Sequence, residues 1–322
     1  MRQAGDLEEA LRRYGGTAED WLDLSTGLNS SPYDLPRIAP SAWTRLPDPD
    51  RERLLRATAR RAFAVSTMAE VVPFPGVQAA LHSVARLRPP GTVCVLSPTY
   101  GGYAAAFRVA GWDVLEAEHA LPADALVMAN PNNPDGRRWN PEEVTEISTH
   151  YPLMIVDESF CDPEPDLSTA TASAREGLVV LRGFGSFYGL GGVRLGFAVT
   201  GPETASQLQA IAGPWPVSGP AIEIGIAALG DVEWASETRQ RLADDCERLD
   251  TRALESGWSV AGGTRLFRLY EIPDAMAAQH QLAERQIWTR RFPYSATWLR
   301  VGLPGDEFGW LRITAALAEI SE

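Results

Sequence analysis

The sequence predicts an α/β protein with one large layered domain, built on a mostly parallel sheet, and a smaller α+β domain after it. Short, fully apolar runs of four or five residues alternate with helical patterns through the first two thirds of the 322 residues. Such runs are typical of strands that are buried on both faces of a parallel sheet. Beyond residue 219, a long helical stretch leads into further short strands, which indicates a second domain.

The predicted elements follow in chain order. Residues 1–40 form an N-terminal arm with a helix at 7–14 and a Pro-rich segment. Residues 41–218 form the large domain, with strands at 92–96, 125–128, 153–156, 178–181 and 195–199 and helices at 77–87, 102–110 and 141–150. Asn140 is the expected N-cap of the last of these helices. Residues 219–322 form a long connecting helix, to about Gly257, and the small C-terminal domain, with strands at 258–261, 266–270, 287–289 and 298–301.

The composition argues against several classes of protein. The formal net charge is −13 and the arginines are scattered, which disfavours a nucleic-acid or anionic-membrane surface. The three cysteines form no CxxC motif and no Cys/His pair at zinc spacing, so we expect neither a disulfide framework nor a metal site. Apolar runs stay short of the roughly 18 residues of a membrane span, and the chain starts without a signal-like apolar core. These features predict a cytoplasmic protein.

Three local patterns point to a ligand site at strand ends. Pro73-Phe-Pro-Gly76-Val77-Gln78 places a glycine turn at a helix start, where backbone N–H groups and the helix dipole favour an anion. Ser97-Pro-Thr-Tyr100 offers an aromatic face after a buried strand, where ligands of open α/β sheets bind. Asn130-Pro-Asn-Asn133 supplies amide donors after the next strand. A loop, a packing tyrosine and a turn are the alternative explanations.

Two further patterns add charged groups. Asp157-Glu158 ends an apolar strand, and an Asp there is costly unless it is paired, for example with a protonated ring nitrogen. A capping or salt-bridging Asp is the alternative. The glycine-rich segment 182–197 contains Arg194, whose guanidinium suits phosphate oxygens, although a flexible loop with a solvent-exposed arginine would look the same.

Together, in order and spacing, these patterns resemble the fold-type I pyridoxal-phosphate enzymes of the histidinol-phosphate aminotransferase branch. Within that branch the chain is most similar to the threonine-phosphate decarboxylases of cobalamin biosynthesis. The resemblance covers nearly the whole chain, through the segments 21–29, 130–136, 157–160, 193–197, 213–220, 292–295 and 298–304. It implies a fold-type I, aminotransferase-like fold with a three-layer large domain.

The resemblance also implies a role for each matching residue. Gly76, Val77, Gln78 and Arg194 would bind the cofactor phosphate, Tyr100 would stack on the pyridine ring, Asn133 would reach its O3′ and Asp157 its nitrogen. Arg300 would bind the substrate carboxylate, with Gly27 and Asn29 nearby. The implied ligand is a small amino acid or phosphorylated amino acid, and the implied assembly is a homodimer, without nucleic acid or membrane. A heteromeric partner is the alternative assembly.

The sequence departs from the family most clearly at its Schiff-base lysine, which aligns with Ser186. The chain contains no lysine at all, since its 29 basic residues are arginines. A serine hydroxyl cannot form an imine or move protons as an amine does, so normal Schiff-base catalysis is excluded. Gly183 stands where relatives commonly carry a hydroxyl for the cofactor phosphate, and Phe160 replaces a tyrosine. The family's His-Gly-Gly-Asn and Tyr-Pro-Asp elements are Gln3-Ala4-Gly5-Asp6 and Leu46-Pro47-Asp48.

Several functions agree with this pattern. The chain is a divergent, lysine-free homologue that binds pyridoxal or pyridoxamine 5′-phosphate noncovalently, if it binds a cofactor at all. Alternatives are a non-catalytic pseudoenzyme or partner subunit, and a histidinol-phosphate aminotransferase-like transaminase whose lysine has been replaced. A lysine-free enzyme that uses a histidine is disfavoured, because the four histidines lie far from position 186 in the sequence. A serine hydrolase is discarded, because Gly185-Ser186-Phe-Tyr-Gly189 does not match G-x-S-x-G.

Overall fold

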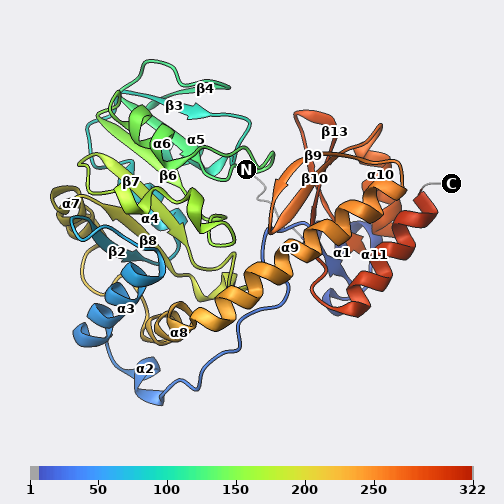
Figure 1. Ribbon diagram of the computed structural model, residues 1–322, viewed down its shortest axis with the longest axis horizontal. Coiled ribbons are helices and arrows are strands. Elements are labelled where there is room, and N and C mark those ends of the chain that lie inside the picture. Colours follow the sequence, from blue (N-terminus) through green and yellow to red (C-terminus); the bar gives the residue numbers. More distant parts are fainter. Residues whose placement is uncertain (1–6, 321–322) are drawn as a thin grey trace. The chain divides into compact units, whose positions relative to one another are not determined.

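A computed structural model describes residues 7–320, which form two compact units (Figure 1). Unit 1 contains three segments: the described residues up to Pro32, the short segment Pro134–Gly136, and the described residues from Glu237 onward. Unit 2 contains Tyr33–Asn133 and Arg137–Ser236. The division differs from the expected limits at 1–40, 41–218 and 219–322, because most of the N-terminal segment belongs with the C-terminal one and the later boundary falls inside helix α9, Val232–Glu255.

Unit 2 is built on a seven-stranded sheet in the order β2-β8-β7-β6-β5-β3-β4. The strands are β2 Glu70–Phe74, β3 Thr92–Leu96, β4 Asp113–Ala117, β5 Ala125–Ala129, β6 Leu153–Asp157, β7 Leu178–Gly183 and β8 Gly196–Thr200. The five strands from β7 to β4 run parallel, whereas β8 is antiparallel to β7 and to β2. The prediction of an α/β domain on a mostly parallel sheet is therefore confirmed.

Helices cover both faces of this sheet, which makes three layers. The helices of unit 2 are α2 Pro40–Thr44, α3 Pro49–Ala62, α4 Val77–Val84, α5 Gly102–Val109, α6 Pro141–Ser148, α7 Pro202–Ala212 and α8 Gly219–Gly230, with short 3-10 turns at Pro165–Leu167, Thr169–Ala172 and Gly191–Val193. The apolar faces of α4, α5 and α7 join one core, and α6 joins the other. The central strands are buried on both sides, since every residue of β5, β6 and β7 is buried.

The elements predicted inside the sheet are confirmed within a few residues, and so are the helix at Leu7–Tyr14 and the N-cap at Asn140. The prediction of one long helix from Gly219 to about Gly257 was wrong. The chain breaks at Asp231 into α8 and α9, because the Asp231 carboxylate accepts a hydrogen bond from the backbone N–H of Trp234 at 3.0 Å. An Asp in this position starts a new helix rather than continuing the old one.

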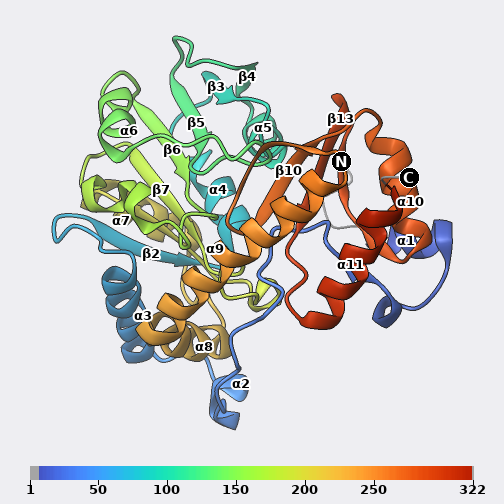
Figure 2. The same ribbon diagram turned by 45° about the vertical axis from the view of Figure 1, so that its right-hand side comes forward.

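Unit 1 contains a four-stranded antiparallel sheet, in the order β12-β13-β10-β9, and a short parallel pair, β1-β11. Its strands are β1 Leu22–Asp23, β9 Ser259–Thr264, β10 Phe267–Glu271, β11 Ile287–Trp288, β12 Arg290–Phe292 and β13 Ser295–Gly302. Its helices are α1 Leu7–Tyr14, α10 Ala275–Glu284 and α11 Glu307–Ile320, together with most of α9 and a 3-10 turn at Ala18–Asp20. Figure 2 shows β13 beside α10.

Candidate functional site

The candidate cofactor residues lie in unit 2, most of them where strands of its sheet end. Tyr100 follows β3, Asn133 follows β5, Asp157 ends β6 and Gly183 ends β7. Because β3, β5, β6 and β7 run parallel, their carboxyl ends share one edge of the sheet, which is where open α/β sheets bind ligands.

Gly76 lies at the start of α4, and together with Arg194 it forms a candidate phosphate site, here called the phosphate cradle. Its φ of +88° is open to glycine but strained for other residues, and α4 has no side-chain cap in the described structure. A Cβ on Gly76 would lie 2.7 Å from Arg194 Nη2, so the missing side chain lets that exposed guanidinium lie against the helix start. Gly196 has a similar role, since its Cβ would lie 2.7 Å from the backbone nitrogen of Val77. A helix start and an arginine together suit a phosphate.

Asp157 is a buried carboxylate at this edge, with 6% of its surface exposed. Its Oδ1 accepts hydrogen bonds from Ser159 Oγ at 2.5 Å and Ser159 N at 2.9 Å, and its Oδ2 accepts one from Tyr103 Oη at 2.9 Å. Burial raises the pKa of Asp157 above its ordinary value, and the three donors oppose that rise. A carboxylate in this environment would be stabilised further by a positively charged partner.

Tyr100 links the aspartate to the phosphate cradle. Its half-buried ring lies edge-on to that of Tyr103, with centroids 5.4 Å apart and planes at 85°. Burial and the Asp157 charge raise the pKa of Tyr100, whereas the Arg194 charge lowers it, so all three groups lie within electrostatic reach. The Tyr100 hydroxyl donates to Gln78 Oε1 at 3.2 Å.

Sequence reasoning missed two members of this site, Tyr103 and His82. His82 Nε2 lies 3.2 Å from Gln78 Nε2, so a histidine belongs to the hydrogen-bonded surroundings of the cradle despite its distance from position 186 in the chain. Both residues could have been found by helical spacing, because side chains three or four positions apart share a helix face. Tyr103 is three residues after Tyr100, and His82 is four after Gln78.

The remaining residues of the edge lie around this centre. Asn133 and Phe160 are half-buried beyond β5 and β6. The neighbouring Asn132 ties the β5 and β3 loops together, since its side chain donates to Pro98 O at 2.9 Å and accepts from Thr99 at 2.7 Å. Ser186 is half-buried in the turn that follows β7, and it makes no hydrogen bond within the described part of the chain.

The candidate substrate residues belong to unit 1. Arg300 lies on β13 with 2% of its surface exposed, and its Nη2 donates to Ser25 O at 2.5 Å. Asn29 is also buried, but its side-chain oxygen accepts from Arg241 Nη2 at 2.8 Å and from Ser31 N at 3.1 Å, which makes it a structural anchor of this segment. Gly27 lies between Ser25 and Asn29 in the chain and is half-exposed. The residues Gln3–Asp6, compared above with the family's His-Gly-Gly-Asn element, lie outside the described residues.

Arg290, in unit 1, is a third residue that sequence reasoning missed. It lies on β12 directly opposite Arg300 in the antiparallel ladder, and the two positive charges repel each other. Burial and then Arg290 lower the pKa of Arg300 to about 10, which leaves the Arg300 guanidinium charged at neutral pH. A buried guanidinium beside a second positive charge is stabilised by a bound anion. The signal in the sequence was the Arg290-Arg291 doublet, ten residues before Arg300.

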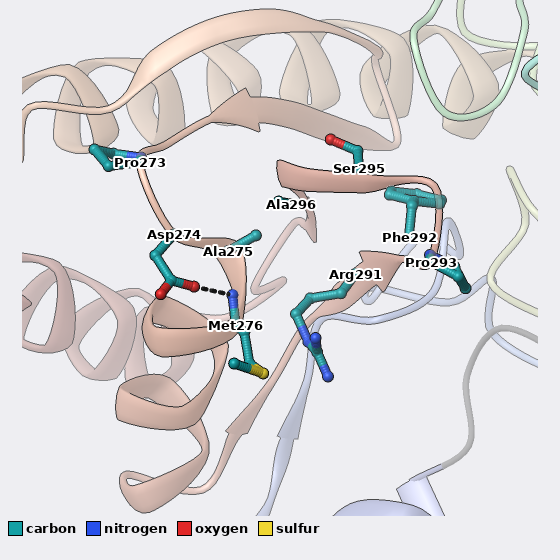
Figure 3. A pocket seen from close by; sticks show the side chains of 9 residues that line it. All are labelled: Pro273, Asp274, Ala275, Met276, Arg291, Phe292, Pro293, Ser295 and Ala296. Carbon is teal, nitrogen blue, oxygen red and sulfur yellow. Dashed lines mark hydrogen bonds between the residues drawn. The ribbon is translucent and has the colours of Figure 1, made fainter.

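Unit 1 also has a surface pocket of about 460 Å³ that contains none of the expected site residues (Figure 3). Its polar side chains are engaged in the fold: Asp274 accepts from the first N–H groups of α10, and Arg291 Nε donates to Gln279. Among residues 7–320, no cluster of His, Cys, Asp and Glu could hold a metal ion. No helix in the same range is both long and apolar enough to cross a membrane.

The fold agrees with comparisons to known proteins. The family model described as aminotransferase class I and II matches residues 34–318. The chain belongs to this family. Threonine-phosphate decarboxylase of Pseudomonas aeruginosa is 41% identical over 334 residues, covering 100% of this chain and 98% of the relative. A protein of the same name from a Sinorhizobium species is 40% identical, covering 98% of this chain and 97% of the relative.

Solved structures of low sequence identity show the same fold. Histidinol-phosphate aminotransferase of Sinorhizobium meliloti, in complex with pyridoxal-5'-phosphate, has a TM-score of 0.83 at 20% identity and covers 100% of this chain and 95% of its own. L-threonine-O-3-phosphate decarboxylase of Porphyromonas gingivalis has a TM-score of 0.75 at 19% identity and covers 92% of this chain and 98% of its own. The predicted fold-type I aminotransferase-like fold is therefore confirmed.

Proposed function

We propose that this chain is a divergent, lysine-free homologue of the threonine-phosphate decarboxylases that binds pyridoxal or pyridoxamine 5′-phosphate without a covalent bond. The observation that carries the proposal is the combination, within unit 2, of the uncapped start of α4, the Arg194 guanidinium and the buried Asp157. A phosphate dianion needs the first two groups, and a protonated pyridine nitrogen needs the third. The charges of the site therefore fit those of the cofactor.

Each residue of the site would have a definite task. The cofactor, when bound, supplies an electron-accepting ring to an amino-acid substrate. Asp157 would hold the proton on the ring nitrogen, since a buried carboxylate is stabilised by a positive partner. Tyr100 would lie against the ring, and Asn133 would donate from its amide to the ring oxygen. Arg194 and the N–H groups of Val77 and Gln78 would hold the phosphate.

The substrate we propose is an amino acid that carries a phosphate. Its support is the pair Arg290 and Arg300, which offers two positive charges in unit 1, together with the names of the two relatives at 40% and 41% identity. Arg300 would bind the carboxylate through two parallel N–H donors, and Arg290 adds positive charge beside it. A phosphorylated amino acid would bring a second anionic group to these two guanidiniums.

Ser186 favours a second candidate, a non-catalytic pseudoenzyme or partner subunit. A serine cannot hold the cofactor by an imine, and no histidine or carboxylate in the described structure hydrogen-bonds to the Ser186 hydroxyl to activate it. In that case the unit 2 site would bind the cofactor as a structural ligand, or would remain without one. Turnover of O-phospho-L-threonine by the loaded protein, measured as carbon dioxide release, separates the two candidates.

The proposed function is tested by titration with pyridoxal phosphate. We expect a yellow complex that survives desalting, and no increase in polypeptide mass after borohydride, since the chain contains no lysine. Arg194→Gln should weaken binding by about tenfold or more, because one charged hydrogen-bonding group is lost. Arg108→Gln, which removes a surface arginine paired with Glu116 in the same unit, is the matched control and should bind normally.

The variant Ser186→Lys tests whether the vacancy at 186 is the reason for noncovalent binding. With a lysine at this position, borohydride should fix the cofactor to the polypeptide and raise its mass. Colourless wild-type protein without measurable affinity, in a sample whose fold is intact by circular dichroism, would overturn the proposed function.

We also propose that the chain forms a homodimer. Large apolar side chains are exposed in unit 2 at Trp43, Leu46 and Trp215, with 66%, 67% and 50% of their surface accessible. Exposed apolar groups of this size are typical of surfaces that another chain covers. Sedimentation equilibrium should give twice the mass of one chain, and a double variant Trp43→Glu, Leu46→Glu should shift it to the monomer.

A further inference from the structure

Ser159 and Gly183 lie side by side at the carboxyl edge of the unit 2 sheet. Asp157 pairs with Leu181 in the parallel ladder of β6 and β7, and the N–H of Glu158 continues this ladder by donating to Leu181 O at 2.8 Å. Residues two apart along a strand share a face, so Gly183 lies on the same face of β7 as Leu181, and Ser159 lies in the turn that directly follows β6.

The space above Gly183 is filled by Ser159. A Cβ on Gly183 would lie 2.7 Å from Ser159 Oγ, 2.9 Å from its Cβ and 3.1 Å from its Cα. Real Cβ atoms do not approach other atoms as closely as 2.7 Å, so a side chain at position 183 and the serine at position 159 exclude each other in this arrangement. Gly183 is required here by its neighbour and not by its own backbone, because it has no positive φ.

The Ser159 hydroxyl is directed at the buried carboxylate. It donates to Asp157 Oδ1 at 2.5 Å, while Tyr103 from helix α5 holds the opposite oxygen at 2.9 Å. The carboxylate is thus held at both ends, and its plane is fixed relative to the edge of the sheet. Tyr100 is a further titratable group near this place, since the Asp157 charge raises the pKa of Tyr100 and the Arg194 charge lowers it.

We propose that Ser159 is a positioning residue for Asp157, and that it has taken over the volume which a side chain at position 183 would need. The proposal rests on the proposed function for its role toward the cofactor. The resemblance to the family implies a hydroxyl at position 183 for the cofactor phosphate. In this chain the hydroxyl at this place belongs to Ser159, in the turn after β6, and it donates to the carboxylate that we propose faces the ring nitrogen. Gly183 and Ser159 are then the two halves of an exchange that their shared volume links.

The exchange has an electrostatic consequence. Burial raises the pKa of Asp157, and the hydrogen bonds from Ser159 are the strongest influences that oppose this rise, followed by that from Tyr103. A buried carboxylate that loses such donors takes up a proton more readily. Without the Ser159 hydroxyl, Asp157 would spend more of its time as the neutral acid, which no longer favours a protonated ring nitrogen.

The first experiment needs no cofactor and tests the shared volume. Gly183→Ala should lower the melting temperature by about 5 °C, since overpacking of this kind is costly. In the background of Ser159→Gly the same substitution should lower it by less than half as much, because its Cβ then meets no side chain. Tyr103→Phe, which removes the other hydroxyl on Asp157 but does not touch Gly183, is the matched background and should give no rescue. If the Gly183 and Ser159 substitutions lower the melting temperature additively, the proposal that these two residues share one volume is overturned.

The second experiment, also without cofactor, follows stability against pH. Because the folded-state pKa of Asp157 is raised, its contribution to stability is fully present below the ordinary aspartate pKa and is lost as the pH rises through the folded value. Ser159→Ala should extend this loss to a pH about one unit higher, the shift that follows from losing one hydrogen bond to a charge. In the background of Asp157→Asn the same substitution should cause no shift. An unchanged pH profile in Ser159→Ala would overturn the positioning role.

The third experiment adds pyridoxal phosphate and separates this proposal from the proposed function. In Ser159→Ala and in Tyr103→Phe, the decline of cofactor affinity toward acid pH should begin at a higher pH than in the wild type. Wild-type protein that binds no cofactor would refute the proposed function, while the first two experiments would still decide the relation of Ser159 to Gly183 and Asp157. Normal cofactor binding with an unshifted acid decline in Ser159→Ala would refute the inference alone.

Discussion

Removal of Arg182 should be among the most damaging single substitutions in unit 2. Arg182 is 2% exposed, and its Nη1 donates to Glu158 Oε2 at 2.8 Å while its Nη2 donates to Asp162 Oδ1 at 2.7 Å. Arg182→Met keeps most of the apolar stem but leaves two buried carboxylates without their cation. Breaking a buried ion pair in this way costs about 3–5 kcal/mol. We therefore expect a loss of this size in the free energy of unfolding at pH 7.

The loss should also depend on pH in a defined direction. Burial already raises the pKa of Glu158, and the Arg182 charge is the main influence that opposes it. Without Arg182 the folded-state pKa of Glu158 rises further, so the stability difference is small at low pH and grows as the pH rises through the new value. Each additional proton held by the folded state changes the stability by about 1.4 kcal/mol per pH unit.

Urea unfolding, followed by tryptophan fluorescence at pH 5, 7 and 8, measures both effects. Arg108→Met is the matched control, because Arg108 pairs with Glu116 at a site where both side chains are about half exposed, 50% and 47%. Exposed pairs of this kind contribute about 0–1 kcal/mol. A loss below about 1 kcal/mol for Arg182→Met at pH 7, or a loss that does not grow with pH, would refute this account of the buried network.

Three further predictions concern the two candidate sites and the fold. Gly76→Ala should weaken pyridoxal phosphate binding by about tenfold in calorimetry, because the new Cβ would lie 2.7 Å from Arg194 Nη2 at a φ of +88°; unchanged affinity would count against the cradle. Arg300→Gln should weaken O-phospho-L-threonine binding by about 10- to 100-fold, whereas Arg291→Gln, whose Nε binds Gln279, should not; equal losses would argue against a specific role. Gly136→Ala should destabilise unit 1, because its φ is +69° and its Cβ would overlap the carbonyl of Gly263; an unchanged melting temperature would contradict this.

The interior of the unit 2 sheet could be predicted from the sequence, and its edges could not. Strands such as β5 and β6 are apolar throughout because both of their faces are buried. The two edge strands lack this pattern. β4 is mostly exposed and mixes polar with apolar residues, and β2 contains Pro73, which normally argues against a strand.

The candidate site divides in a similar way. Gly76, Asp157 and Arg194 stand in local patterns with a chemical meaning of their own, so the sequence alone could point to them. The relation of Ser159 to Gly183 depends on which strands are neighbours and in what register, and that of Arg290 to Arg300 depends on an antiparallel ladder. Such pairs are set by tertiary structure, which a single sequence does not display.

The central claim is that a chain without lysine keeps a noncovalent site for a pyridoxal-type cofactor at the edge of unit 2. Calorimetric titration with pyridoxal phosphate, compared with pyridoxamine phosphate, tests it most directly. We predict saturable binding of both compounds at one site per chain, weakened in Arg194→Gln and in Asp157→Ala. Absence of heat for both ligands with folded wild-type protein, or binding that neither substitution alters, would contradict the claim.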